Sequence, residues 1–238
     1  MNIDCLSHSL ARPLLASGCL AFITAAGLGS FERPIFPDCL NAASAANSFR
    51  PTEHNVDCNK DALNLWNDRS VREGAKLLGI NAEEVRLFGC MPAPFRTVPA
   101  LGSSNQKFSI YYPTGVQLGQ GGYIAPLLHE MGHVFQLKLV GSYQKLQASH
   151  DNSIERIELG ADFIAGYAAG HLDLEPKAFL VNLSLIGSYN GKDLDYHGRP
   201  EDRAAAFRNG YFYMERQSTL TDSYADFQDN RFAQIKNH

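Results

Sequence analysis

Apolar residues recur at helical spacing through most of the chain beyond residue 122, and this pattern predicts a series of helices. We expect them over residues 123–140, 153–169, 176–187 and 200–213. Gly141 and Gly170 follow the first two helices, Asn152 or Ser153 can cap the second, and Pro200 suits the first turn of the fourth. The polar segment after residue 213 is expected to form a short helix or a tail.

The first half of the chain shows a weaker pattern. Residues 61–78 have the spacing of a helix that ends at Gly79, with these inward positions: Leu63, Trp66, Ala75 and Leu78. Residues 85–88 and 108–112 are rich in β-branched and aromatic residues, and they are predicted as strands joined by turns that contain proline. Residues 31–57 carry prolines and small polar residues, and we expect irregular structure there.

Strands followed by helices indicate an α+β fold, mostly helical with a small sheet. The 238 residues are enough for one domain with a substantial core. We therefore expect a single domain over residues 31–238, in which residues 31–104 have no assigned role.

The N-terminal segment differs from the rest of the chain. Residues 14–28 contain no charged residue, Arg12 precedes them, and they end in small residues. This layout is typical of a secretory signal peptide, which we predict over residues 1–30, and a buried N-terminal helix is the alternative. At about fifteen residues the run is shorter than the roughly twenty that cross a membrane, so no membrane span is expected in the mature chain. The prediction implies export, to the periplasm or outside the cell.

Charge and cysteine content narrow the classes of partner and site. The formal net charge is -4, and no basic stripe is interleaved with aromatic residues, so nucleic acid is not an expected partner. Removal of the signal peptide would leave Cys39, Cys58 and Cys90, of which any two could pair in an exported protein. No C-x-x-C spacing occurs, which argues against a cysteine-based zinc or redox site.

Residues 129–133 read His-Glu-Met-Gly-His within the first predicted helix. Positions i and i+4 share one face of a helix, so His129 and His133 can bind the same metal ion. Two imidazoles leave room for a third ligand and for water, and Glu130 is placed to act on that water as general base. The alternative is two histidines and a glutamate that share a helix without a common role.

The next predicted helix carries a candidate third ligand. Glu158 and Asp162 are four residues apart, which places both carboxylates on one face beside an apolar stripe. Burying such a pair is costly unless a positive group meets it. One Zn²⁺ ion bound by Glu158, and a ligating histidine held by Asp162, would supply that positive group. A solvated acidic face is the alternative, and Glu155 is the alternative third ligand.

The order of these motifs resembles the gluzincin branch of the zincins, in which a helix with H-E-x-x-H precedes a helix with E-x-x-x-D. More narrowly, roughly residues 105–212 resemble the bacterial neutral zinc metallopeptidases. Three blocks carry the resemblance: His129, Glu130, Gly132, His133 and Gln136; then Glu158, Leu159, Ala161, Asp162, Ala165 and Gly166; then His197, Gly198, Arg203, Phe207 and Gly210. Phe163 departs from the family pattern, which often has cysteine there, and this difference is expected to affect packing.

The resemblance implies a zincin-like fold and a zinc metallopeptidase that acts on proteins or peptides. Glu130 would activate the water that attacks a peptide carbonyl, and His197 would donate to the resulting oxyanion. His197 could instead anchor the following helix, and Tyr196 is a second candidate donor. Arg203 is expected to pair with a carboxylate of the scaffold. By analogy, the strand over residues 108–112 is expected to offer an edge to which an extended peptide adds.

Two hypotheses compete with an active peptidase. One is a non-catalytic protein that keeps zinc for stability or for binding a partner, and the other is a helical interaction domain without a metal. Glu130 favours catalysis, because a purely structural site has no use for a base. The histidines outside the motifs show no partner pattern and are interpreted as surface or structural residues: His8, His54, His150, His171 and His238.

Overall fold

The computed structural model describes most of the chain beyond residue 56. The described ranges are residues 57–60, 62–91, 95–99, 107–114, 122–186, 198–215 and 218–236. The predicted signal peptide and nearly all of the segment 31–57 lie outside them. The described part is mostly helical with one small sheet, which confirms the predicted α+β class.

The sheet contains four strands in the order β1-β2-β4-β3. Their bounds are β1 (Asp57–Lys60), β2 (Val85–Met91), β3 (Arg96–Pro99) and β4 (Phe108–Pro113). The central pair β2 and β4 is parallel, whereas β1 is antiparallel to β2 and β3 is antiparallel to β4. The sequence predicts only the central pair, because β1 and β3 are four residues each and too short to show a clear alternation.

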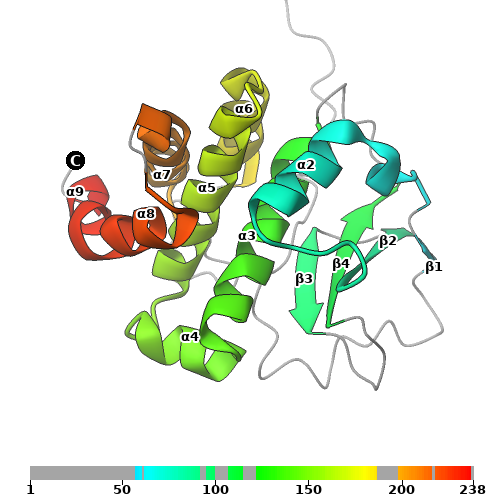
Figure 1. Cartoon of the computed structure of the whole chain (residues 1–238), viewed down its shortest axis with the longest axis horizontal. Helices are drawn as coiled ribbons and strands as arrows, with labels where there is room; N and C mark the ends of the chain where they lie inside the picture. The colour runs from blue at the N-terminus through cyan, green and yellow to red at the C-terminus, as the bar shows by residue number, and fades with distance from the viewer. Residues whose placement is uncertain are drawn as a thin grey trace, which may run out of the picture. The chain divides into compact units, whose positions relative to one another are not determined.

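The expectation that residues 108–112 offer a free edge is wrong. Ile110 of β4 pairs with Leu87 of β2 on one side and with Thr97 of β3 on the other, so β4 is a central strand. The edge strand on this side of the sheet is β3, which lies against α3 (Ile124–Val140), as Figure 1 shows. The expectation comes from analogy alone, and β3, which the sequence pattern does not predict, occupies that edge of β4.

A disulfide ties the other edge of the sheet. It joins Cys58 of β1 to Cys90 of β2, two residues that lie opposite each other in the strand register. The sequence predicts a possible pair among three cysteines without identifying the two, because spacing alone does not show which residues face each other.

The helix predicted over residues 61–78 is shorter than expected. A 3-10 turn, η1 (Leu65–Asn67), precedes α2 (Arg69–Leu77), and Asp68 separates them. The Asp68 carboxylate accepts hydrogen bonds from two main-chain N–H groups of the first turn of α2 and thereby fixes its start. Leu63 precedes both elements, and it is 42% exposed rather than inward-facing.

Two long helices, α3 and α5 (Ile154–His171), form the centre of the helical part. In Figure 1, α3 lies between the sheet and the helices α5 to α7, which explains why both of its faces are largely apolar and buried. As predicted, α3 ends at Gly141, whose φ is +88°, and Ser153 caps the start of α5. The predicted stop at Gly170 is wrong, since α5 continues through it to His171.

The remaining helices pack against this centre. Two of them match predicted helices to within two residues at their ends: α6 (Pro176–Ile186) and α7 (Pro200–Tyr211). The others are the short α4 (Tyr143–Ser149), η2 (Phe212–Glu215), α8 (Leu220–Asp226), the π-helical turn η3 (Phe227–Arg231) and α9 (Phe232–Lys236). The polar C-terminal segment is therefore helical, and its Tyr224 and Phe227 belong to the core. Within the described ranges, no helix has the length and apolarity needed to cross a membrane.

Candidate metal centre

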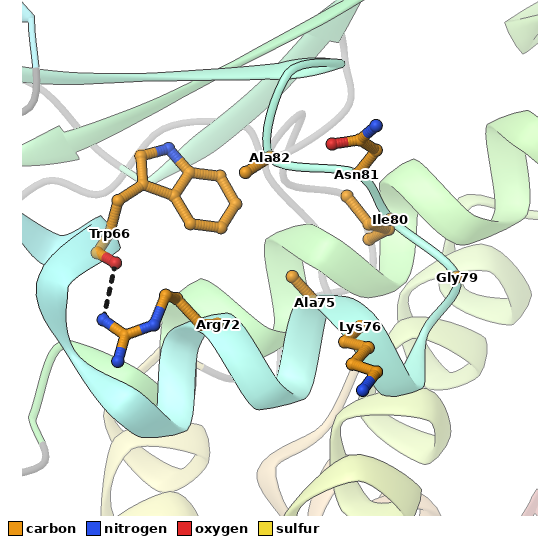
Figure 2. A pocket seen from close by; sticks show the side chains of 8 residues that line it. All are labelled: Trp66, Arg72, Ala75, Lys76, Gly79, Ile80, Asn81 and Ala82. Atoms are coloured by element: carbon orange, nitrogen blue, oxygen red, sulfur yellow. Dashed lines mark hydrogen bonds between the residues drawn. The ribbon is translucent and has the colours of Figure 1, made fainter.

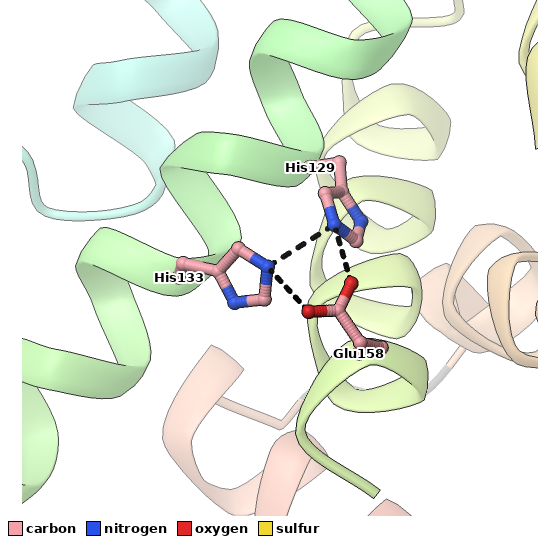
Figure 3. A group of neighbouring side chains, drawn as sticks. All are labelled: His129, His133 and Glu158. Carbon is pink, nitrogen blue, oxygen red and sulfur yellow. Dashed lines mark hydrogen bonds and ion pairs between the residues drawn. The ribbon is translucent and has the colours of Figure 1, made fainter. Parts of the chain in front are cut away.

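Two helices bring three candidate ligands together. His129 and His133 lie one turn apart on α3, and Glu158 faces them from α5 (Figure 3). All three side chains are buried, and one ligand atom of each lies within 4.8 Å of the others. This group could hold a metal ion, and it consists of the three residues that the sequence predicts as ligands.

The distances between the facing atoms suit a small divalent cation. Nε2 of His129 lies 3.1 Å from Nε2 of His133 and 3.2 Å from Oε2 of Glu158. Nε2 of His133 lies 3.5 Å from Oε1 of Glu158. Ligand atoms about 2.0–2.1 Å from a tetrahedral zinc ion are about 3.3–3.4 Å apart. The donor types and their separations therefore fit a His₂Glu zinc site.

Asp162 and Arg203 hold the outer nitrogen of the His129 ring. Oδ1 of Asp162 lies 2.8 Å from Nδ1 of His129. Arg203 binds the same carboxylate through two hydrogen bonds, from Nε to Oδ2 at 2.7 Å and from Nη2 to Oδ1 at 2.8 Å. Because an ionised carboxylate only accepts, a neutral His129 carries its proton on Nδ1 and turns the Nε2 lone pair toward His133 and Glu158. The predicted pairing of Arg203 with a scaffold carboxylate is confirmed.

Charges around His129 and Asp162 set how this pair titrates. Burial by itself lowers the pKa of His129, but the Asp162 and Glu158 carboxylates raise it, and the pKa in the metal-free protein is about 9. Burial by itself raises the pKa of Asp162, but the Arg203 guanidinium and the His129 ring lower it below its usual range. The metal-free site therefore holds a proton on His129 at neutral pH, and a metal ion would displace that proton.

A second polar network fixes the ring of His133. Oε1 of Gln136 lies 2.9 Å from Nδ1 of His133, and Nε2 of Gln136 donates at 2.9 Å to both the Ile157 carbonyl and the Tyr224 hydroxyl. A main-chain carbonyl only accepts, so the amide nitrogen must face Ile157 and the amide oxygen must face His133. A neutral His133 therefore carries its proton on Nδ1, and its Nε2 lone pair faces Nε2 of His129.

The network continues from Tyr224 of α8 to His150. The Tyr224 hydroxyl lies 3.0 Å from Nε2 of His150, and Nδ1 of His150 lies 2.9 Å from the Leu146 carbonyl. The carbonyl accepts the Nδ1 proton, so Tyr224 donates to Nε2 while it accepts from Gln136. Burial lowers the pKa of His150, which favours the neutral ring that this arrangement needs. His150 is thus a buried structural residue, one of the two roles expected for it.

Glu130, the candidate base, is fully buried on α3 next to His129. The hydroxyl of Thr97 on β3 lies 2.7 Å from Oε2 of Glu130 and 2.9 Å from the Glu130 main-chain carbonyl. The other carboxylate oxygen, Oε1, has no hydrogen-bond partner among the described residues. An unsatisfied buried carboxylate oxygen costs free energy, and a water molecule or substrate that donates to Oε1 would remove that cost.

The sequence also singles out four residues beyond the metal ligands and Glu130: Glu155, Phe163, Tyr196 and His197. His197 and Tyr196, the candidate oxyanion donors, lie outside the described residues. Glu155 forms an ion pair with Lys236 at 2.6 Å and is not part of the group that could hold a metal, so it does not replace the predicted third ligand. Phe163 is fully buried in the core, in keeping with an effect on packing.

Sequence analysis did not identify the roles of Thr97 and Tyr224. Thr97 lies in a strand too short to be predicted, and Tyr224 lies in a segment interpreted as a short helix or a tail. Both are distant in sequence from the residues that they contact, so spacing along the chain does not show what they contact. The one available signal was the helical spacing of Leu220, Tyr224 and Phe227, which places apolar groups of that segment on one face.

A surface hollow of about 440 Å³ lies elsewhere in the described part of the chain (Figure 2). Residues of η1, α2 and the turn after α2 line it, and on its wall Nη1 of Arg72 donates to the Trp66 carbonyl at 3.1 Å. The hollow shares no residue with the group formed by His129, His133 and Glu158, so it is separate from the candidate metal centre.

Comparison of the chain with protein-family models, with curated proteins and with solved structures gives no match.

Proposed function

We propose that the protein is a zinc metallopeptidase with a zincin-like fold, in which His129, His133 and Glu158 bind one Zn²⁺ ion and Glu130 is the general base. The observation that carries this proposal is the convergence of two ring nitrogens and a carboxylate in the protein interior. When both rings are neutral, three electron-pair donors face one another in the protein interior, and such an arrangement favours a bound cation.

The donor set supports a catalytic zinc site rather than a structural one. Structural zinc sites usually have four protein ligands and are rich in cysteine, whereas catalytic sites have three ligands and an open position. The group in the described part of the chain contains two histidines, one glutamate and no cysteine. A bound zinc ion would supply a Lewis acid that polarises the peptide carbonyl and lowers the pKa of water.

The residues around the ligands support the proton transfers of peptide hydrolysis. Oε1 of Glu130 takes a proton from the attacking water and passes it to the leaving nitrogen as the C–N bond breaks. Asp162 and Gln136 hold His129 and His133 in the tautomers that metal binding needs. Because of the family resemblance, we propose that His197 donates a hydrogen bond to the oxyanion.

The proposed substrate is a protein or peptide in an extended conformation. β3 is the edge strand next to α3, and its Thr97 contacts Glu130. An extended peptide that adds to this edge would form main-chain hydrogen bonds with β3 and pass close to the base. This edge replaces residues 108–112, which the structure places in the middle of the sheet.

We also propose that the protein acts outside the cytoplasm, either in the periplasm or as a secreted protein. The disulfide between Cys58 and Cys90 supports this location, because disulfides rarely persist in a reducing cytoplasm. The predicted signal peptide over residues 1–30 is in agreement with it.

Metal content measured by elemental analysis tests the ligand set. We expect about one zinc ion per chain in the wild type and in Glu155→Ala, and a clear loss in Glu158→Ala, in line with one three-ligand site. Glu155→Ala is the matched control, since it removes a glutamate from the same helix that is not part of the group that could hold a metal. Equal zinc in Glu155→Ala and Glu158→Ala would contradict the assignment of Glu158.

Glu130→Gln separates catalysis from a non-catalytic zinc role. This change keeps the size of the side chain and removes its ability to take a proton. We expect normal zinc content and a loss of peptide hydrolysis by about 10²- to 10⁴-fold, the usual contribution of a general base. A zinc-loaded wild type that hydrolyses no peptide in a broad substrate library would favour the non-catalytic alternative.

A further inference from the structure

Thr97 is the only described residue outside α3 whose side chain is recorded in a hydrogen bond with Glu130. It is fully buried in β3, where its main chain pairs with Ile110 of β4. The sheet therefore fixes where the Thr97 hydroxyl lies, and the hydroxyl reaches the candidate base from a separate element of the fold.

The Thr97 hydroxyl lies between two acceptors of the same residue. Oε2 of Glu130 is 2.7 Å away and the Glu130 main-chain carbonyl is 2.9 Å away. The hydroxyl has a single proton, and the shorter distance and the negative charge favour donation to the carboxylate. The carbonyl then receives no proton of its own, so the hydrogen bond that holds the carboxylate is the one to Oε2.

This arrangement makes the two carboxylate oxygens of Glu130 unequal. Oε2 is occupied by Thr97, whereas Oε1 is buried without a partner among the described residues. A carboxylate held by one oxygen cannot rotate freely about its last torsion angle. The oxygen that remains available to accept a proton is therefore Oε1.

We propose that Thr97 is a positioning residue for Glu130, which holds Oε2 so that Oε1 is the oxygen that exchanges protons with water and substrate. This inference rests on the proposed peptidase function. During turnover, Oε1 takes a proton from the attacking water as the new C–O bond forms. Oε1 then gives the proton to the leaving nitrogen as the C–N bond breaks. The Thr97 proton stays on its own oxygen, and Glu130 returns to its starting state.

Thr97→Val and Thr97→Ser provide the test in the zinc-loaded full-length protein. Valine keeps the shape of threonine and removes the hydroxyl, whereas serine keeps the hydroxyl. We expect Thr97→Val to lower kcat for a peptide by about 10- to 100-fold with little change in KM, since a loosely oriented base reacts less often. Thr97→Ser should recover most of that loss. Zinc content should be unchanged in both variants, because the Thr97 hydroxyl is bonded to Glu130 and not to any of the three ligands.

Two further comparisons exclude a merely structural effect. Thr114→Val is the matched control, since the Thr114 hydroxyl donates to the Cys90 carbonyl at 3.3 Å and not to Glu130. It should leave kcat unchanged. In a Glu130→Gln background, Thr97→Val should cause no further loss, because a residue that acts only through Glu130 has nothing left to position. If Thr97→Val does not fold, Thr97→Ala serves in the same comparisons.

Crystal structures of the zinc-loaded wild type and Thr97→Val give a readout that does not depend on activity. We expect the Glu130 carboxylate to change its orientation, or to occupy several, when the hydroxyl is absent. An unchanged orientation of the Glu130 carboxylate in Thr97→Val would overturn the inference. This result would count even if the wild-type protein hydrolyses no peptide and the proposed function is wrong. A wild-type kcat in Thr97→Val, alongside a large loss in Glu130→Gln, would overturn it while leaving the peptidase function intact. Failure of Thr97→Ser to recover activity would also overturn it.

Discussion

At the scale of single residues, the site depends on where the proton of His129 lies. The ring faces the Asp162 and Glu158 carboxylates, the Arg203 guanidinium and the His133 ring. Its pKa is about 9 in the folded metal-free protein, above the value of about 6.5 in an unfolded chain. The folded state therefore binds this proton more tightly than the unfolded state. The resulting stability is fully present below about pH 6.5 and is lost as the pH rises through about 9.

This titration predicts opposite pH responses of stability and of zinc affinity. The melting temperature of the metal-free protein should fall between about pH 7 and pH 9, in the range set by the two pKa values. Zinc affinity should rise over the same range, by up to about tenfold per pH unit, because zinc displaces the proton. Thermal unfolding and competition titrations across this range measure both effects. A zinc affinity that is flat with pH would show that His129 is already neutral in the metal-free protein.

The ligands could be predicted from the sequence because each pair is local. His129 and His133 share a helix face, and so do Glu158 and Asp162, so the period of the helix predicts each pair. The cost of burying two carboxylates beside an apolar stripe then links the second pair to a metal held by the first. Thr97 could not be predicted in this way. Its contact with Glu130 spans 33 residues and depends on the position of β3 in the sheet, which no local pattern records.

At the scale of elements, the metal centre requires α3 and α5 to approach closely. Gly132 lies between the two histidines, and a Cβ atom there would be 2.9 Å from the Ala161 carbonyl oxygen and 3.1 Å from the Ala161 Cα. Both are backbone atoms of α5, so a side chain at this position must push the two helices apart. Because α3 carries the histidines and α5 carries Glu158, the helix separation also sets the distances between the ligands.

Gly132→Ala should therefore lower both stability and zinc affinity. Helix propensity alone would favour alanine by about 1 kcal/mol, but overpacking at a tight contact costs about 1–3 kcal/mol. We expect a net decrease in the free energy of unfolding and a clear loss of zinc affinity, measured by urea denaturation and by competition with a chelator. A stabilised variant with normal affinity would mean that the helices can separate there at no cost.

The length of a helix explains how well the sequence predicts it. Helices α3, α5, α6 and α7 are long enough for their apolar pattern to identify them. The stop predicted at Gly170 is wrong because this glycine serves a helix contact: a Cβ atom there would collide with the backbone of Tyr211. Glycine ends a helix when it adopts a positive φ, as Gly141 does, and the sequence does not distinguish these two uses.

At the scale of the whole molecule, the candidate centre draws on segments from both ends of the described chain. β3 supplies Thr97 to the base, and α8 supplies Tyr224 to the network that holds His133 through Gln136. The C-terminal helices are thus part of the support of the site. The sequence motifs that predict the site end near residue 212, so they do not include Tyr224. Its contact with Gln136 spans 88 residues, and no local pattern in the sequence predicts it.

Tyr224→Phe tests whether this distant support reaches the metal. The change removes one hydroxyl, which leaves an N–H of Gln136 without its acceptor and Nε2 of His150 without its donor. We expect the free energy of unfolding to fall by about 1–3 kcal/mol, the cost of unsatisfied buried polar groups. Zinc affinity should fall by less than about tenfold, at the low end for partners of metal ligands, because the Ile157 carbonyl still orients Gln136.

Tyr211→Phe is the matched control for this experiment. It removes a hydroxyl that donates to the Leu174 carbonyl at 3.1 Å, in a contact that includes no residue of the metal centre. Its zinc affinity should equal that of the wild type, even if its stability falls. If Tyr224→Phe also binds zinc with wild-type affinity, the C-terminal helices only cover the core. A loss of affinity confined to Tyr224→Phe would instead make α8 part of the metal centre, because only the Tyr224 hydroxyl is bound to Gln136, which holds the His133 ring.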